Sequence, residues 1–289
     1  MDDIRSQAHL SGKEVKQLNF IKDSKLYVFR KYYRSGLRSH IFEVVSSQDV
    51  EKETTGVLED GIRVFPRAKP IKMFRIFRNR FGSKEEIFLE IKRYKTLLSV
   101  LGPEYIARSE EFIADYRGTD PSGRILLCGL QEYVDGQILD PWRVSGPENI
   151  SALLSAMDHD ATMEERTRTA MGNIACFIQG IRRLMDQTGY IPDLAGLGNL
   201  ILTPEGGIKL VDINNIVEIK KDKFIHLDDK GYPACDVSVQ VLAILEEKLL
   251  GQNHSDTDPL FKLFLTPDRI RQVKAIEQAF YRQLNATNT

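Results

Sequence analysis

The chain has 289 residues, of which 42% are hydrophobic, and its 40 basic and 41 acidic side chains leave a net charge of −1. It can therefore bury a substantial core, and the near-zero charge predicts no global attraction to nucleic acid or anionic membranes, although local patches stay open. The sequence has no stretch of roughly 18 apolar residues, no secretory signal and no metal or disulfide spacing among its three cysteines, so we expect a cytoplasmic protein without a membrane span. Export without a cleaved signal also stays open.

Short strands dominate the first part of the chain. Aromatic and β-branched residues favour strands at residues 25–34, 39–45, 61–65, 71–78, 106–115 and 124–133. Residues 46–60 are polar and charged, which predicts a long loop and the best candidate for disorder. Ser83 is a good N-cap, and the helical spacing of apolar residues after it predicts one amphipathic helix over residues 85–100.

Helices dominate after the turn at residues 134–136. Apolar residues at helical intervals predict a helix over residues 162–188, a buried helix over 237–250, and one or two more over 260–284. Residues 200–202 and 208–211 flank turn residues and predict a small hairpin. The whole pattern indicates an α+β protein of two lobes joined by a hinge: residues 1–131, with an N-terminal extension, and residues 132–289.

The residues with candidate chemistry lie in one segment, residues 190–213. Several enzyme signatures are missing from the chain, including the GxxxxGK[ST] phosphate loop, HExxH and GxSxG. In the segment, Asp193 follows the long helix, Asn199 opens the hairpin and Asp212 closes it. Because a hairpin brings its two ends together, Asn199 and Asp212 would offer a carbonyl and a carboxylate oxygen to a hard cation such as Mg²⁺. Asp193 would lie nearby as a candidate base.

This segment resembles the catalytic loop and metal-binding motif of the protein kinase-like superfamily, HRDLxxxN followed by a hairpin and DFG. Asp193-Leu194 matches the Asp-Leu, Asn199 the Asn, and Asp212-Ile213-Asn214 the DFG. The resemblance extends in order over residues 71–250. It includes a hinge-like LQEYVDG at residues 130–136, and Asp236 with the buried helix that anchors the catalytic loop in kinases.

The resemblance implies a bilobal kinase-like fold and a site for ATP and Mg²⁺. Asn199 and Asp212 would hold the metal, and Asp193 would accept the proton of the acceptor hydroxyl. Arg75 or Lys72 would contact phosphate and pair with Glu90 of the helix. The adenine edge would lie against the backbone of the hinge residues, which are Gln131, Glu132, Tyr133 and Val134.

The sequence also departs from the family pattern. Ile191 and Pro192 replace the His and Arg of HRD, and the spacing from Asp193 to Asn199 is one residue longer than usual. No glycine-rich loop is found; only Asp60-Gly61 is available where the first hairpin should turn. The segment between Asp212 and Asp236 is short, which fits a small-molecule or atypical kinase better than a phosphorylation-switched one.

Two functional hypotheses follow. The first is a phosphotransferase that uses ATP and Mg²⁺ to modify a hydroxyl on a protein or a small molecule. The second is a pseudokinase, a kinase-shaped scaffold that no longer turns over nucleotide.

Overall fold

The computed structural model describes residues 3–7, 9–22, 25–32, 37–116, 124–252 and 257–287 of an α+β protein. The chain divides into two compact units. The first, here called the sheet unit, comprises residues 1–92 and 108–133, and the second, the helix unit, comprises residues 93–107 and 134–289. Residues 93–107, which the sequence analysis assigned to the first lobe, thus belong to the helix unit.

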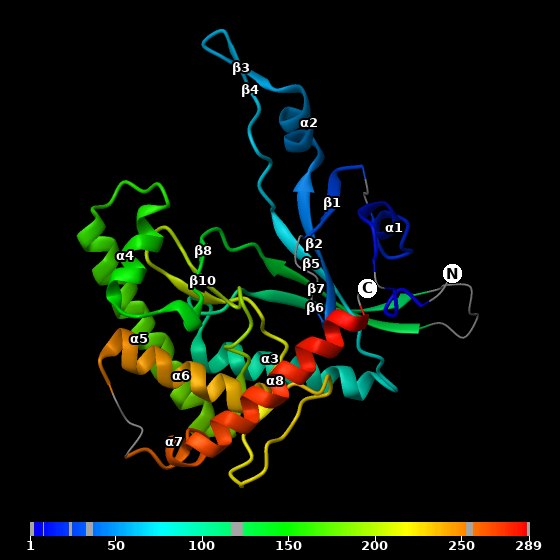
Figure 1. The fold of residues 1–289 in the computed structure, drawn as a ribbon. Coiled ribbons are helices and arrows are strands. Elements are labelled where there is room, and N and C mark those ends of the chain that lie inside the picture. Colours follow the sequence, from blue (N-terminus) through cyan, green and yellow to red (C-terminus); the bar gives the residue numbers. More distant parts are fainter. Residues whose placement is uncertain are drawn as a thin grey trace. The chain divides into compact units, whose positions relative to one another are not determined.

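Five antiparallel strands in the order β1-β2-β5-β7-β6 form the main sheet of the sheet unit (Figure 1). Their bounds are Tyr27–Lys31 (β1), Ser39–Ser46 (β2), Lys72–Phe77 (β5), Ser109–Tyr116 (β6) and Arg124–Glu132 (β7). Each confirms a strand predicted from its aromatic and β-branched residues. Helix α3, Lys84–Leu101, confirms the single helix predicted between the strands.

The sheet has an apolar core on each face. Along β5, Phe74 and Ile76 belong to one buried cluster, whereas Phe77 belongs to another with Ile87 of α3 and Leu127 of β7. Because successive residues of a strand point to opposite faces, the first half of α3, which belongs to the sheet unit, covers one face of the sheet, and another segment must cover the other.

The N-terminal segment covers that second face. It contains the short helix α1, Gly12–Lys16, and its apolar side chains are almost fully buried with Phe74 and Ile76. These side chains are Ile4, Leu10, Val15 and Leu18. The N-terminal extension is therefore part of the core of the sheet unit.

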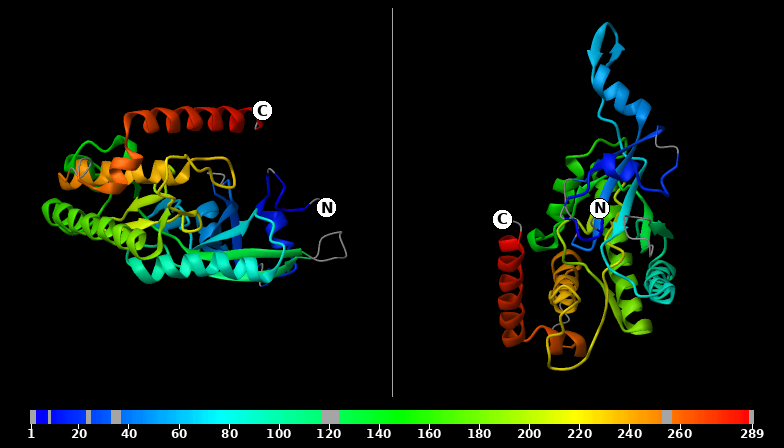
Figure 2. Two further views of the ribbon diagram at one scale, coloured as in Figure 1. Left: turned by 90° about the horizontal axis from the view of Figure 1, so that it is seen from below. Right: turned by 90° about the vertical axis from the view of Figure 1, so that its right-hand side faces the viewer.

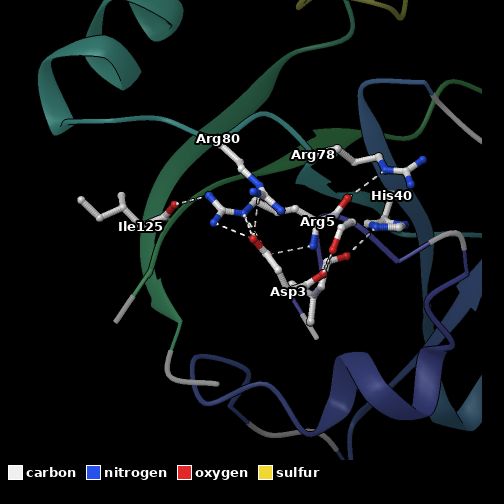
Figure 3. A network of polar contacts seen from close by, with 8 residues as sticks. Asp3, Arg5, His40, Arg78, Arg80 and Ile125 are labelled. Atoms are coloured by element: carbon white, nitrogen blue, oxygen red, sulfur yellow. Dashed lines mark hydrogen bonds and ion pairs between the residues drawn. The ribbon is translucent and has the colours of Figure 1, made fainter. Parts of the chain in front are cut away.

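Buried polar contacts hold the start of this segment in place (Figure 3). Arg5 forms an ion pair with Asp3 at 2.9 Å, and its backbone carbonyl accepts a hydrogen bond from Arg78 at 3.1 Å. Nε2 of His40, on β2, lies 2.9 Å from the carbonyl oxygen of Ile4. Burial lowers the pKa of His40, so the folded protein favours the neutral imidazole at this contact.

The prediction of a loop over residues 46–60 is wrong. Helix α2, Ser47–Thr55, is followed by a separate hairpin of β3, Val57–Glu59, and β4, Ile62–Val64, which together project from the main sheet (Figure 1). The helix is polar and buries none of its residues, so its composition resembles that of a loop. Asp60 and Gly61, both with positive φ, form the turn of this separate hairpin rather than the first turn of the main sheet.

In the described residues, the helix unit contains most of the helices and two small sheets, β11-β10-β8 and β12-β9. Its helices are α4 (Pro147–Ser155), α5 (Met163–Thr188), α6 (Ala234–Leu250), α7 (Pro259–Phe264) and α8 (Pro267–Thr287), with a 3₁₀ turn at Pro141–Arg143. Its strands are β8 (Gln137–Ile138), β9 (Tyr190–Pro192), β10 (Leu200–Leu202), β11 (Ile208–Leu210) and β12 (Ile216–Glu218). The predicted long helix and small hairpin are confirmed as α5 and β10–β11.

Helix α6 lies at the centre of this unit. Both views in Figure 2 show α8 alongside α6, with α5 on the other side. The side chains of Val237, Val241 and Leu245 are fully buried, which agrees with the nearly all-apolar sequence of α6. No helix in the described part of the chain has the length and apolar character that crossing a bilayer requires.

The neutral form of His40 predicts a pH dependence of the N-terminal segment. Folding lowers the pKa of His40, so the unfolded chain binds more protons than the folded chain. The contribution of His40 to the free energy of unfolding therefore decreases as the pH falls below about 6.5. The charges of Arg78, Lys31 and His9 also oppose protonation of the ring. We expect faster hydrogen exchange of the α1 amides, relative to intrinsic rates, as the pH decreases through this range. His40→Gln should remove most of this dependence; an unchanged profile in the variant would contradict the assignment.

Candidate active site

The candidate site is built on two strand pairs of the helix unit. Strand β9 pairs with β12, and β10 pairs with β11. The loop from Asp193 to Asn199 joins β9 to β10, and the residues after β11 lead to β12. These pairings bring the loop and the end of the hairpin to one place: the Asp193 amide donates to the carbonyl of Asn215 at 2.8 Å, and the Val211 amide donates to that of Asn199 at 2.8 Å.

Asn199 is held so that its amide nitrogen is used within the loop. Its Nδ2 donates to the backbone carbonyl of Asp193 at 3.0 Å, and its backbone amide donates to the carbonyl of Gly196 at 2.9 Å. A Cβ atom at Gly196 would lie only 2.6 Å from the Asn199 amide group, so a side chain there would force the Asn199 amide to move. The side-chain oxygen of Asn199 then remains as a neutral acceptor for a ligand.

The carboxylate of Asp193 is buried, with an exposed fraction of 8% for the residue. Its Oδ1 accepts from the backbone amide of Ala195 at 2.9 Å, and its Oδ2 accepts from Nδ2 of Asn215 at 3.0 Å. Burial, followed by the negative charge of Asp212, raises the pKa of Asp193 to about 6 despite these donors. Asp193 therefore has the pKa of a group that can exchange a proton near neutral pH.

Asp212 follows β11 and is half-buried. The hydrogen bond from the Val211 amide to the Asn199 carbonyl brings the neighbouring Asp212 to the loop, where its negative charge is the second cause of the raised pKa of Asp193. In the described residues, no group of three or more His, Cys, Asp and Glu side chains is arranged to hold a metal ion. One carboxylate and one amide oxygen, from Asp212 and Asn199, nevertheless suit Mg²⁺ that is bound together with phosphate oxygens.

Sequence reasoning missed two residues that fix the loop. Asn215 is 7% exposed and provides the side-chain donor to Asp193. Ser238 of α6 is fully buried, and its Oγ accepts from the backbone amide of Leu194 at 3.2 Å. Asp236, the residue expected to anchor the loop, instead forms a buried ion pair with Arg269 of α8 at 2.5 Å. The position of Asn215 directly after the DFG-like segment was the one signal in the sequence.

Trp142 lies beside the same loop. Its indole Nε1 donates to the carbonyl of Ala195 at 3.3 Å, while 46% of the residue stays exposed. An indole fixed at one end and exposed over its face can stack against a planar or ring-shaped ligand.

The other predicted residues belong to the sheet unit, except Val134, which is in the helix unit. Gln131 is buried near the end of β7. Glu132, the last residue of this strand, and Tyr133, which follows it, are half-buried. The Glu132 carboxylate accepts from the backbone amide of Arg108 at 3.2 Å. Glu90 is half-buried on α3.

Arg75 is buried on the face of the sheet that α3 covers. It forms an ion pair with Glu111 of β6 at 2.8 Å, although β7 lies between their strands. Gly129 of β7 is opposite both residues, and a Cβ atom there would lie 2.9 Å from the Glu111 carboxylate. The glycine therefore makes room for the pair. Strand alternation puts Lys72 on the opposite face, with Phe74 and Ile76, so Lys72 is poorly placed to substitute for Arg75.

Comparison of the sequence with models of known protein families finds no match, and comparison with curated proteins finds no significant match.

The role of Asn215 can be tested by its removal. Asn215→Ala would leave a buried carboxylate with one donor fewer, so we expect a loss of about 1–3 kcal/mol in the free energy of unfolding at neutral pH. Asn173→Ala is the matched control, since its Nδ2 donates to the neutral carbonyl of Gly206 at 2.9 Å. Urea denaturation of both variants measures the difference. The loss in Asn215→Ala should shrink at low pH, where Asp193 is neutral; equal losses in both variants at every pH would contradict this role.

Proposed function

We propose that this protein is a phosphotransferase of the kinase-like superfamily, with a bilobal fold, and that it uses ATP and Mg²⁺ to modify a hydroxyl group on a small molecule or a protein. The observation that carries the proposal is the arrangement of Asp193, Asn199 and Asp212 at the meeting point of two strand pairs. The three residues occur in the order and the structural context of the kinase motif that they resemble.

Asn199 and Asp212 are assigned to the metal. The Asn199 amide is oriented by its bond to the Asp193 carbonyl, so its oxygen is presented without the entropic cost of fixing a free side chain. Mg²⁺ bound there would neutralise charge on the phosphates. Phosphoryl transfer needs mainly such positioning and charge neutralisation, which two well-placed oxygen donors supply.

Asp193 is assigned to bind the acceptor hydroxyl and to accept its proton. With a pKa of about 6, its carboxylate is mostly ionised at neutral pH and can still take up a proton. Its two donors, the amide of Ala195 and the side chain of Asn215, hold the carboxylate in one orientation. It would therefore orient the hydroxyl and receive its proton as the phosphoryl group is transferred.

Arg75 is assigned to phosphate, in place of Lys72. Its position on the α3 face, where the kinase cation is expected, supports this choice, and its pair with Glu111 orients the guanidinium. A pairing of Arg75 with Glu90, and contact of adenine with the backbone of Gln131, Glu132, Tyr133 and Val134, remain expectations from the resemblance.

The pseudokinase is the second candidate function. Ile191 and Pro192 in place of His and Arg favour it, and the Asp60-Gly61 turn is excluded as a phosphate-binding loop of the main sheet, because it belongs to the separate β3–β4 hairpin. This candidate keeps the fold and loses turnover, so nucleotide binding and turnover must be measured separately.

Asp212→Ala tests the metal assignment. ATP with Mg²⁺ at a hundred times its dissociation constant should stabilise the natural protein by about 2.7 kcal/mol in a thermal-shift titration. Asp212→Ala should lose this shift and any γ-phosphate release while melting normally without ligand. Asp186→Ala, which removes an exposed carboxylate of α5, is the control and should behave like the natural protein. A stabilised natural protein without phosphate release would favour the pseudokinase, and full activity of Asp212→Ala would refute the assignment.

The raised pKa of Asp193 predicts the pH dependence of turnover. A base must be ionised, so kcat/KM should increase as the pH rises through about 6 and then level off. Asn215→Ala removes a donor that lowers the pKa of Asp193, so the midpoint should move to higher pH. Steady-state rates across the range measure the midpoint. A midpoint that stays fixed in Asn215→Ala would exclude Asp193 as the titrating base.

A further inference from the structure

The loop between β12 and α6 exposes an unusual set of side chains. Lys220, Lys221 and Lys223 are exposed, and Leu227 is 51% exposed. Phe224, at 73%, is the most exposed large hydrophobic residue of the described chain. Single exposed apolar residues need no explanation, but two of them among three lysines in eight residues form a distinct basic-apolar surface. Residues 220–227 are called the basic-apolar loop below.

The backbone of the basic-apolar loop is fixed. The Arg269 side chain of α8 donates to the carbonyl of Asp222 at 2.7 Å and to that of Phe224 at 3.0 Å. Arg269 is itself only 6% exposed and is paired with Asp236, which is 1% exposed on α6. In Figure 1 this loop, coloured yellow, passes beside α8. The exposure of Phe224 is thus a property of a fixed backbone conformation.

The charge of the loop is locally positive. Within residues 220–227, three lysines are accompanied by one acidic residue, Asp222. The next two residues are also acidic, but Asp228 accepts from the backbone amides of Lys230 and Tyr232, and Asp229 pairs with Lys230 at 3.6 Å. The Asp222 carboxylate accepts from the backbone amide of Phe224 at 2.9 Å and contacts Nε2 of His226 at 2.9 Å. It is therefore engaged within the loop, while the lysines are exposed to solvent.

We propose that the basic-apolar loop binds the surface of anionic lipid bilayers. The lysines would contact the lipid head groups, while Phe224 and Leu227 would enter the boundary between head groups and acyl chains. Lysines beside exposed aromatic and aliphatic side chains match both layers of such a surface. An acidic protein would attract the lysines but would need a fitted pocket for Phe224, whereas an acyl boundary accepts the ring without one. With a net charge of −1, only a local patch of the chain can give this attraction.

Vesicle cosedimentation of the full chain tests the proposal. We expect binding to phosphatidylcholine vesicles that contain phosphatidylserine, no binding to phosphatidylcholine alone, and release by high salt. Each lysine near an anionic surface contributes roughly fivefold to the partition coefficient, so Lys220→Gln, Lys221→Gln and Lys223→Gln together should lower it by about a hundredfold. The control variant carries Lys13→Gln, Lys25→Gln and Lys95→Gln, three exposed lysines elsewhere, and should bind like the natural protein.

The apolar contribution has its own control. Phe224→Ser with Leu227→Ser should weaken vesicle binding about tenfold or more, because both side chains leave the acyl boundary. Leu58→Ser with Ile62→Ser, at positions 64% and 69% exposed on the β3–β4 hairpin, should bind as before. Circular dichroism and melting verify the fold of each variant. Absence of binding to anionic vesicles, or equal losses in the control variants, would overturn the proposal. Tight binding of polyglutamate that does not depend on Phe224, with weak vesicle binding, would instead identify an acidic protein partner.

Discussion

The buried carboxylate of Asp193 is the constraint on which the candidate site depends. A charge at this depth is stable only if it is hydrogen-bonded, and its side-chain donor, Asn215, comes from a segment that is brought close by the pairing of β9 with β12. The adjoining amide of Leu194 is satisfied by Ser238 of α6. Strand pairing, central helix and loop are thus mutually dependent, and a change that separates β9 from β12 would also release the carboxylate.

The fold was predictable where the sequence pattern of an element is strong. The helix α5 follows from the helical spacing of its apolar residues, because it buries one face, and the strands of the main sheet follow from their aromatic and β-branched residues, which are buried on both faces of the sheet. Helix α2 buries nothing, so its polar sequence has the composition of a loop. The burial of the N-terminal segment was not predicted either. Isolated apolar residues such as Ile4 and Leu10 do not indicate burial until the sheet face that they cover is known.

Sequence spacing alone could predict the hairpin of the candidate site. Asn199 and Asp212 stand at the two ends of this hairpin, and the pairing of β10 with β11 confirms it. Ser238 and Glu111 could not be found in this way, because their partners depend on the register between distant elements. The Arg75–Glu111 pair is an example: it requires three strands in register and a glycine at position 129 of the middle one. No local pattern around Arg75 contains that information.

The segment that follows Asp212 also bears on how the proposed enzyme would be controlled. In regulated kinases, phosphorylation orders the activation segment through new pairs between arginine and phosphate. Here a buried arginine already performs that ordering, since Arg269 holds the carbonyls of Asp222 and Phe224 while it pairs with Asp236. The next residues form a tight turn that is also fixed, because the Asp228 side chain accepts from the amides of Lys230 and Tyr232. A segment fixed by internal contacts of this kind has no need of an added phosphate, so under the proposed function the site would be competent as folded.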